Sequence, residues 1–165
     1  MKLLFLRWLS LTLALMMATP AAAGPVFSAR VLKVIDGDSL EVDYAGHKIK
    51  LRLWGIDAPE MRQSYGKQAK IWLAAMVKGR TIEAEAKDID IYNRLVTLVW
   101  VDGQSVNEEM VRQGAAWVYR SYCREGICDT WQSLQNDARS ARRGLWANEK
   151  TFPPWQARRR HDPRK

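Results

Sequence analysis

Hydrophobic and polar residues alternate in several short runs along the chain, and this period of two predicts β-strands. The runs are rich in β-branched residues, and glycine or aspartate often stands between them. The first three are close enough in sequence to form an antiparallel meander, with Ala45-Gly46 as the turn between the second and the third. The predicted strands cover residues 27–35, 39–44, 47–53, 81–86 and 95–101.

Three other segments carry apolar residues at helical spacing. Residues 68–77 place Ala69, Trp72, Leu73 and Met76 on one helical face. The sequence from Ser105 to Glu108 has the form of a capping box, which predicts a helix that Gly114 ends. A last helix is expected over residues 130–142, closed by Gly144.

Five short strands with about three α-helices predict an α+β fold built on a small barrel of the oligonucleotide/oligosaccharide-binding (OB) type. The pattern alone does not distinguish this barrel from other small α+β arrangements. The OB-fold domain is expected over residues 24–155, and Pro153-Pro154 marks the expected end of packed structure. Residues 156–165 are expected to form a basic C-terminal tail.

The first 23 residues have the composition of a secretory signal peptide. Lys2 and Arg7 precede an apolar run over residues 8–18, and the small residues Ala21-Ala22-Ala23 supply a cleavage site. An uncleaved membrane anchor is the alternative, but the run is shorter than the roughly 20 apolar residues of a spanning helix. We expect cleavage after Ala23 and a secreted or periplasmic protein.

The chain is basic, with a formal net charge of +8, and much of this charge lies near the C-terminus. A basic tail can contact the phosphates of a nucleic acid, or it can simply be a solvated terminus. The charge of the tail does not decide between these two interpretations. The basic residues of the tail are Arg158, Arg159, Arg160, Arg164 and Lys165.

Cys123 and Cys128 are the only cysteines, and an even number in an exported chain predicts a disulfide between them. Two cysteines are too few for a structural zinc site, and neither His47 nor His161 lies near them in sequence. A catalytic thiol is disfavoured because no histidine is close to it in the chain.

Acidic residues at the ends of predicted strands indicate a site for a hard divalent cation. Asp38 and Asp57 each stand at the edge of a strand, and a barrel can bring such edges together. Two carboxylates, the Ala58 carbonyl and several waters would satisfy Ca²⁺, which prefers six to eight oxygen ligands. Taken alone, Asp36-Gly37-Asp38 is weak evidence, since most such tripeptides are turns.

Glu60, Arg52 and Arg94 supply the remaining chemistry of a phosphodiesterase. Glu60 follows the rigid Pro59 and can accept a proton from water or position it; alternatively, it can complement the dipole of the next helix. The two guanidinium groups can each bind two oxygens of a phosphate, although a surface ion pair is the commoner role of a strand arginine.

In their order and spacing, these segments resemble those of the staphylococcal nuclease, or thermonuclease, family. The likeness extends from about Val31 to Trp146 and includes Val106-Asn107-Glu108 and Arg143-Gly144-Leu145-Trp146. It implies a five-stranded barrel with three helices, one calcium ion, and hydrolysis of DNA and RNA to 3′-phosphorylated products. By position, it implies calcium ligation by Asp38, Asp57 and the Ala58 carbonyl, and catalytic roles for Arg52, Glu60 and Arg94. Tyr92 and Tyr122 would lie beside the bound nucleotide.

Two positions depart from the family pattern. Ala58 stands where the best-known member has threonine, which leaves a main-chain ligand intact. Asn93 replaces a common glycine, and asparagine tolerates a positive φ better than most residues.

We therefore expect a secreted, monomeric, calcium-dependent nuclease that does not distinguish the sugar of its substrate. The alternative is a non-catalytic exported OB-fold module that binds single-stranded nucleic acid, and its weakness is that binding alone does not require Glu60 or a metal pair. A third interpretation is an envelope scaffold recruited through its basic tail, and only that tail supports it.

Overall fold

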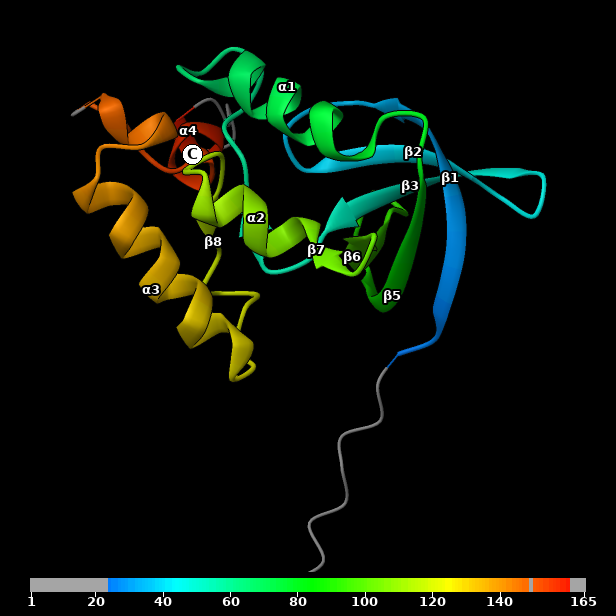
Figure 1. The fold of residues 1–165 in the computed structure, drawn as a ribbon. Coiled ribbons are helices and arrows are strands. Elements are labelled where there is room, and N and C mark those ends of the chain that lie inside the picture. Colours follow the sequence, from blue (N-terminus) through cyan, green and yellow to red (C-terminus); the bar gives the residue numbers. More distant parts are fainter. Residues whose placement is uncertain (1–23, 149, 161–165) are drawn as a thin grey trace, which may run out of the picture.

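Five strands form a closed barrel in the computed structural model, which describes residues 24–148 and 150–160 (Figure 1). Neighbouring strands are antiparallel in the order β3-β2-β1-β5-β6, and a parallel pairing of β3 with β6 closes the barrel. This confirms the predicted α+β fold with an OB-type barrel and all five predicted strands, although β5 runs three residues further than expected. The strands are β1 (Val26–Val34), β2 (Ser39–Tyr44), β3 (His47–Leu53), β5 (Thr81–Ile89) and β6 (Leu95–Val101).

Short strands and helices complete the fold around the barrel. Two-residue strands β4 (Ile56–Asp57) and β8 (Trp117–Val118) pair with each other, and β7 (Gln104–Ser105) extends the sheet beside β6. Figure 1 shows α3 on the side of α2 that faces away from the barrel. The helices are α1 (Gly66–Val77), α2 (Val106–Arg112), α3 (Ile127–Ser140), α4 (Pro154–Arg160) and the 3₁₀ helix η1 (Gly144–Ala147).

The three predicted helices are present, with differences at their ends. The Ser105 side chain accepts a hydrogen bond from the Glu108 N–H, as the capping sequence predicts, and Gly114 has the positive φ of a helix terminator. The last of the three begins at Ile127 rather than Thr130. It ends before Arg142, because Arg142 has a φ of 51° and cannot continue a right-handed helix.

The C-terminal segment differs from the prediction that packed structure ends at Pro153-Pro154. Pro154 instead opens α4, since a proline fits the first turn of a helix, where its missing N–H is not needed. Ala157 on this helix is buried, and the Trp155 ring stacks on Tyr119 at a centroid distance of 4.8 Å. The first residues of the expected basic tail therefore pack against the domain. The signal-peptide prediction and residues 161–165 lie outside the described part of the chain.

The hydrophobic core fills the barrel and continues beneath the helices. Leu40 and Leu51 are fully buried between strands, and Leu73 of α1 covers one end of the barrel core. Trp131 of α3 is also fully buried and meets Trp54 edge to face at 6.0 Å between ring centroids. No helix in the described ranges is long and apolar enough to cross a membrane.

Asn107 joins α2 to the barrel through three buried hydrogen bonds. Its amide nitrogen donates to the carbonyl oxygens of Trp54 (2.9 Å) and Thr97 (3.2 Å), and its Oδ1 accepts from the Val99 N–H (2.9 Å). Asn107 has no exposed surface, and its three hydrogen bonds are buried, so water does not compete for them. Asn107 thus holds the turn after β3, from which the chain enters the candidate site.

Replacing Asn107 with alanine is expected to lower the free energy of unfolding by about 3 kcal/mol, because it leaves buried backbone groups without a partner. Urea denaturation of the purified protein measures this change. Asn136→Ala, on the exposed face of α3, is the matched control and should change stability by only a few tenths of a kcal/mol. Equal effects of the two substitutions would contradict the assigned role.

Candidate active site

A cleft of about 780 Å³ opens beside the barrel and collects the residues that the sequence singled out. It lies where the chain leaves β3, where β5 turns into β6, and where the segment after β8 passes. Asp57 is fully buried just beneath it, bonded to Arg52. The predicted site residues that line the cleft are Asp38, Arg52, Ala58, Glu60, Tyr92, Arg94 and Tyr122.

Arg52 connects the two aspartates. Asp38 stands directly before β2, and the register of β2 with β3 pairs the next residue, Ser39, with Arg52. The Arg52 guanidinium donates from Nη1 to Asp38 Oδ1 at 2.7 Å and from Nη2 to Asp57 Oδ1 at 2.6 Å. The second oxygen of Asp38 accepts from the Ala58 N–H at 2.9 Å, which brings the backbone of Ala58 next to Asp38.

Burial opposes ionisation of two acidic groups at this site, Asp57 and Asp36. Burial raises the pKa of Asp57, and the neighbouring Asp38 adds to this effect against the opposing influence of two arginines. Burial, together with the charge of Asp38, also raises the pKa of Asp36 to about 6. A cation would stabilise the ionised forms of Asp36 and Asp57, and the hard oxygen donors at this place fit calcium.

Within the ranges the structure describes, no three acidic, histidine or cysteine side chains are already gathered as a metal cluster. A bound calcium would therefore draw on the two aspartates, a backbone carbonyl and water, which is a usual mixture for this ion.

Glu60 lies at the mouth of the cleft with its side chain 45% exposed. Its backbone N–H donates to Gln63 Oε1 at 2.8 Å, which holds the turn between Pro59 and α1. The alternative role at a helix start is not supported, because α1 begins six residues later and its first turn has no acidic residue. The carboxylate is thus accessible to water and to substrate.

Arg94 enters the cleft from the loop between β5 and β6. Its Nε and Nη2 both donate to Asp90 Oδ2 at 2.7 Å, and its Nη1 lies 3.2 Å from Ser39 Oγ. Burial alone would raise the pKa of Asp90, but hydrogen bonds from the backbone and side chain of Arg94 lower it. Asn93 takes the positive φ expected of it, at 58°. The ring of Tyr92 is 74% exposed, and the Arg94 guanidinium lies 5.4 Å from its centroid.

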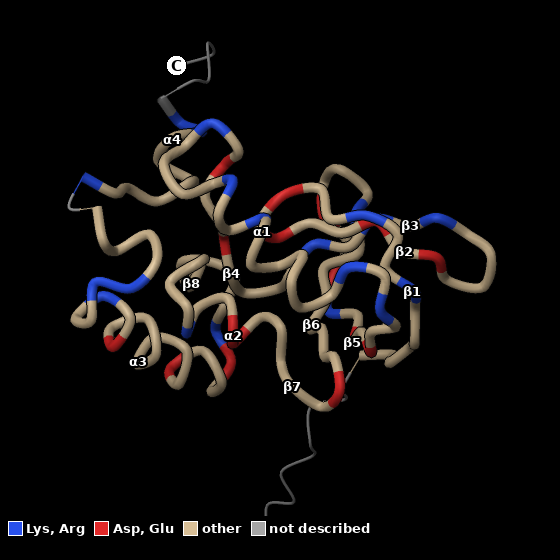
Figure 2. Tube along the Cα trace, turned by 45° about the horizontal axis from the view of Figure 1, so that its top comes forward, with Lys and Arg blue, Asp and Glu red and all other residues tan. Residues whose placement is uncertain are grey.

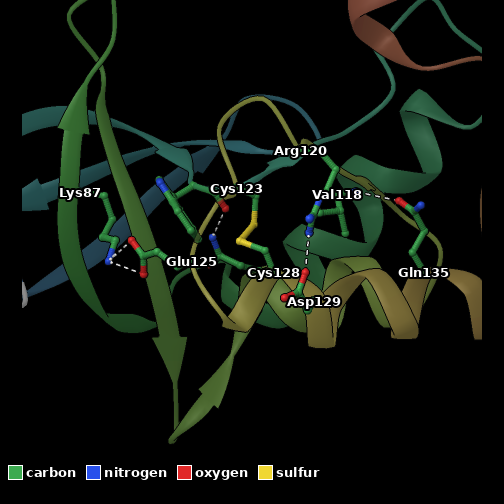
Figure 3. Close-up of a disulfide and its surroundings, with 10 residues drawn as sticks. Lys87, Val118, Arg120, Cys123, Glu125, Cys128, Asp129 and Gln135 are labelled. Atoms are coloured by element: carbon green, nitrogen blue, oxygen red, sulfur yellow. Dashed lines mark hydrogen bonds and ion pairs between the residues drawn. A yellow bond between two sulfur atoms is a disulfide. The ribbon is translucent and has the colours of Figure 1, made fainter. Parts of the chain in front are cut away.

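The disulfide between Cys123 and Cys128 joins the loop after β8 to the first turn of α3 (Figure 3). Both cysteines are fully buried, and the Cys123 sulfur lies close to Gly55, where an added Cβ would come within 2.9 Å of it. Gly55 also has a φ of +72°, so a larger residue would be both crowded and strained. The bridge therefore packs against the turn that leads from β3 into Asp57.

Ion pairs tie the disulfide loop to its neighbours. Glu125 Oε1 accepts from Lys87 Nζ of β5 at 2.9 Å, and Arg120 pairs with Asp129 of α3 at 3.0 Å (Figure 3). Tyr122, at the start of the loop, is 65% exposed and tilts against Tyr119. The loop thus presents Tyr122 at the rim of the cleft.

Replacing both cysteines with serine is expected to lower the free energy of unfolding by about 2 kcal/mol, since the closed loop is short and constrains the unfolded chain only modestly. The variant should remain folded, with a lower midpoint in thermal unfolding followed by circular dichroism. Mild reduction of the original protein should give the same shift. Two titratable thiols in protein isolated under oxidising conditions would contradict the assignment.

Arg158 also lies in the cleft, although the sequence placed it only in the basic tail. Arg158 of α4 donates from Nη2 to Asp57 Oδ2 at 2.6 Å and from Nη1 to Glu60 Oε1 at 2.6 Å. Figure 2 shows basic residues of α4 at the same end of the molecule as β4, which carries Asp57. No sequence spacing links Arg158 to Glu60. The cluster of basic residues near the C-terminus was the only feature of the sequence that could have indicated a role for Arg158.

A second hollow adjoins the cleft and shares Tyr119, Tyr122 and Arg158 with it. It also contains Arg124 from the disulfide loop and Trp155 from α4. Arginine and aromatic side chains together suit the backbone and the bases of a single-stranded nucleic acid.

Comparison with known proteins identifies relatives of the chain. Residues 50–148 match the family model described as staphylococcal nuclease homologue. A protein of Escherichia coli O157:H7 named "Uncharacterized endonuclease" is 40% identical over 79% of this chain and 84% of its own length. A protein of Shigella flexneri named "Micrococcal nuclease" is 31% identical over 93% of this chain and 92% of its own length. "Protein ParB" of Escherichia coli is 36% identical over 92% and 89% of the two chains.

Proposed function

The chain belongs to the staphylococcal nuclease family and is a hydrolytic nuclease, and we propose that it is a secreted, calcium-dependent, monomeric enzyme that cleaves both DNA and RNA to 3′-phosphorylated products. The observation that carries the proposal is the cleft itself. Asp38, Glu60, Arg52 and Arg94 come from separate parts of the chain and line one space there, and the buried Asp57 lies just beneath it. A phosphodiesterase needs these chemical groups in this proximity.

Asp38, Asp57 and the Ala58 carbonyl would hold the calcium ion. When bound, the ion would supply positive charge to a phosphate oxygen and to a nearby water molecule. The chain's part is to keep two carboxylates side by side despite their repulsion, and Arg52 does this by donating to both. Its pKa remains above the ordinary value because the two negative charges outweigh the opposing effect of burial.

Glu60 is the group assigned to the attacking water. Its carboxylate can accept a hydrogen bond from that water and take its proton as the water oxygen approaches phosphorus. The new bond joins the water oxygen to phosphorus, and the bond from phosphorus to the 5′ oxygen breaks. The phosphate therefore stays on the 3′ oxygen. The departing 5′ oxygen takes a proton from solvent water, and Glu60 then releases its proton to solvent.

Arg52 and Arg94 are assigned to the phosphate oxygens, on which negative charge accumulates in the transition state. Each guanidinium is already held at the cleft by a carboxylate, so little side-chain entropy is lost when the phosphate binds. The aspartates that hold them also keep them from rotating towards solvent.

Tolerance of both sugars follows from the kind of contacts that the cleft offers. Contacts to phosphate carry no sequence information, and the exposed rings of Tyr92 and Tyr122 can stack on any base. No part of this assignment requires recognition of a 2′ hydroxyl.

Export is proposed from the N-terminal sequence, with the buried disulfide as support because such bonds persist in oxidising compartments. N-terminal sequencing of the protein recovered outside the cytoplasm tests this. The expected mature chain begins at Gly24.

Plasmid digestion tests the activity. The full mature chain is incubated with supercoiled DNA, or with RNA, in calcium, in magnesium and in chelator, and the product ends are analysed. We expect cleavage of both substrates in calcium alone, with phosphate at the 3′ ends. Binding without cleavage in every condition would contradict the proposal and favour a non-catalytic binding module.

A further inference from the structure

Arg158 binds Asp57 Oδ2, a carboxylate oxygen that a bound cation would also use. Asp57 Oδ2 accepts from Arg158 Nη2 at 2.6 Å, whereas Oδ1 of the same carboxylate is bonded to Arg52. Both oxygens of Asp38 are also engaged, by Arg52 and by the Ala58 N–H. With Arg158 in place, the side chain of Asp57 is only 1% exposed.

The same guanidinium binds Glu60. Arg158 Nη1 lies 2.6 Å from Glu60 Oε1 and 3.3 Å from Asp57 Oδ1, so one planar group bridges the two carboxylates. Its bonds to Asp57, and then to Glu60, raise the pKa of Arg158 despite the opposing effect of burial. The positive charge is therefore permanent, and pH near neutrality cannot release it.

The helix that presents Arg158 has anchors of its own. Trp155 stacks on Tyr119 with the two ring planes 1° apart, and Ala157 is buried against the domain. Movement of the Arg158 side chain therefore does not require α4 to detach. Arg158 lines both the cleft with the carboxylates and the adjoining hollow.

We infer that Arg158 and the divalent cation are alternative occupants of the Asp57 and Glu60 carboxylates, so that the C-terminal helix sets the metal affinity of the site. A cation on Asp57 Oδ2 would lie within a few ångströms of the guanidinium, and two positive groups at that distance repel strongly where water is excluded. This inference rests on the calcium dependence in the proposed function. It adds that Arg158 competes with the calcium ion for the same carboxylates.

The exchange has two effects at once. Without the cation, Arg158 occupies both a metal ligand and the carboxylate assigned to the attacking water. When the cation displaces it, Glu60 becomes free to accept a hydrogen bond from water, and the guanidinium remains close to the path of the nucleic acid. Metal loading and release of Glu60 are thus one event.

Calcium titration by isothermal calorimetry, on the full mature chain without nucleic acid, tests the competition. Arg158→Ala is expected to tighten calcium binding by about tenfold or more, because the cation no longer displaces a bidentate partner. Arg158→Lys should give a smaller gain, since an ammonium group lacks the planar fork that bridges two carboxylates. Arg159→Ala removes the same charge from the same helix and should change the calcium affinity less than twofold.

The outcomes separate the inference from the proposed function. Equal shifts for Arg158→Ala and Arg159→Ala would reduce the effect to net charge and overturn the inference. An unchanged affinity in Arg158→Ala, with calcium-dependent cleavage intact in the original chain, would overturn the inference alone. Absence of calcium binding in both the original chain and Arg158→Ala would overturn it together with the calcium dependence. Thermal unfolding of each variant verifies that it is folded.

Discussion

Glu60→Gln is expected to lower the maximal rate of nucleic-acid cleavage on the order of a hundredfold or more. The substitution keeps the size of the side chain and its ability to accept a hydrogen bond, but an amide cannot take a proton from water. Glu60 is half exposed at the mouth of the cleft and contributes little to the core, so stability should change by less than about 1 kcal/mol. Single-turnover cleavage of a short labelled DNA at saturating calcium measures the rate.

Glu83→Gln is the matched control, because Glu83 is exposed on β5 and lies outside the cleft. It should cleave at the original rate. Binding of a non-hydrolysable nucleotide should be nearly unchanged in Glu60→Gln, since the loss concerns the chemical step. A Glu60→Gln enzyme with a near-normal rate would move the role in water activation to another group.

Asp38→Asn should weaken calcium binding on the order of a hundredfold and lower cleavage by about a thousandfold. The substitution removes one of two negative charges proposed to face the ion and also one partner of Arg52. Asparagine is preferred to alanine here because Asp38 is buried and its oxygens accept from Arg52, Ser39 and the Ala58 N–H. Calorimetric titration with calcium and the cleavage assay follow the two losses separately.

Asp137→Asn on the exposed face of α3 provides the control for Asp38→Asn and should leave both quantities unchanged. Higher calcium should partly restore cleavage in Asp38→Asn if weak metal binding limits the rate. Full activity without any change in calcium affinity would place the metal elsewhere. Thermal unfolding is needed beside both assays, because a buried ion pair is altered.

The barrel was predictable from the sequence because its signals are local. An alternating pattern marked the first three strands, and two later short runs were recognisable as strand candidates. The capping sequence at Ser105 placed the start of α2 where the structure has it. The start of α3 was harder to predict from the sequence. Gly126 and the disulfide-bonded Cys128 lie at that end, and no amphipathic pattern marks the first turn.

The environment of the site depended on long-range contacts. The sequence placed Asp38 and Asp57 at strand ends but did not indicate that both are buried and paired with Arg52. The contact of Arg158 with Asp57 joins residues 101 positions apart, through a helix that opens with the proline expected to end the fold. Neither charge nor periodicity encodes such a pairing, because it depends on where α4 docks.

The parallel pairing of β3 with β6 makes the proposed phosphate-binding pair depend on closure of the barrel. Its register places Arg52 opposite Val96, two residues beyond Arg94, so the two arginines become neighbours only when this seam closes. A chain in which this seam is open would lack the proposed phosphate-binding pair. If the chain is exported unfolded, as the proposed export would allow, the site would form only after translocation, and the genome of the producing cell would not meet the assembled site during synthesis.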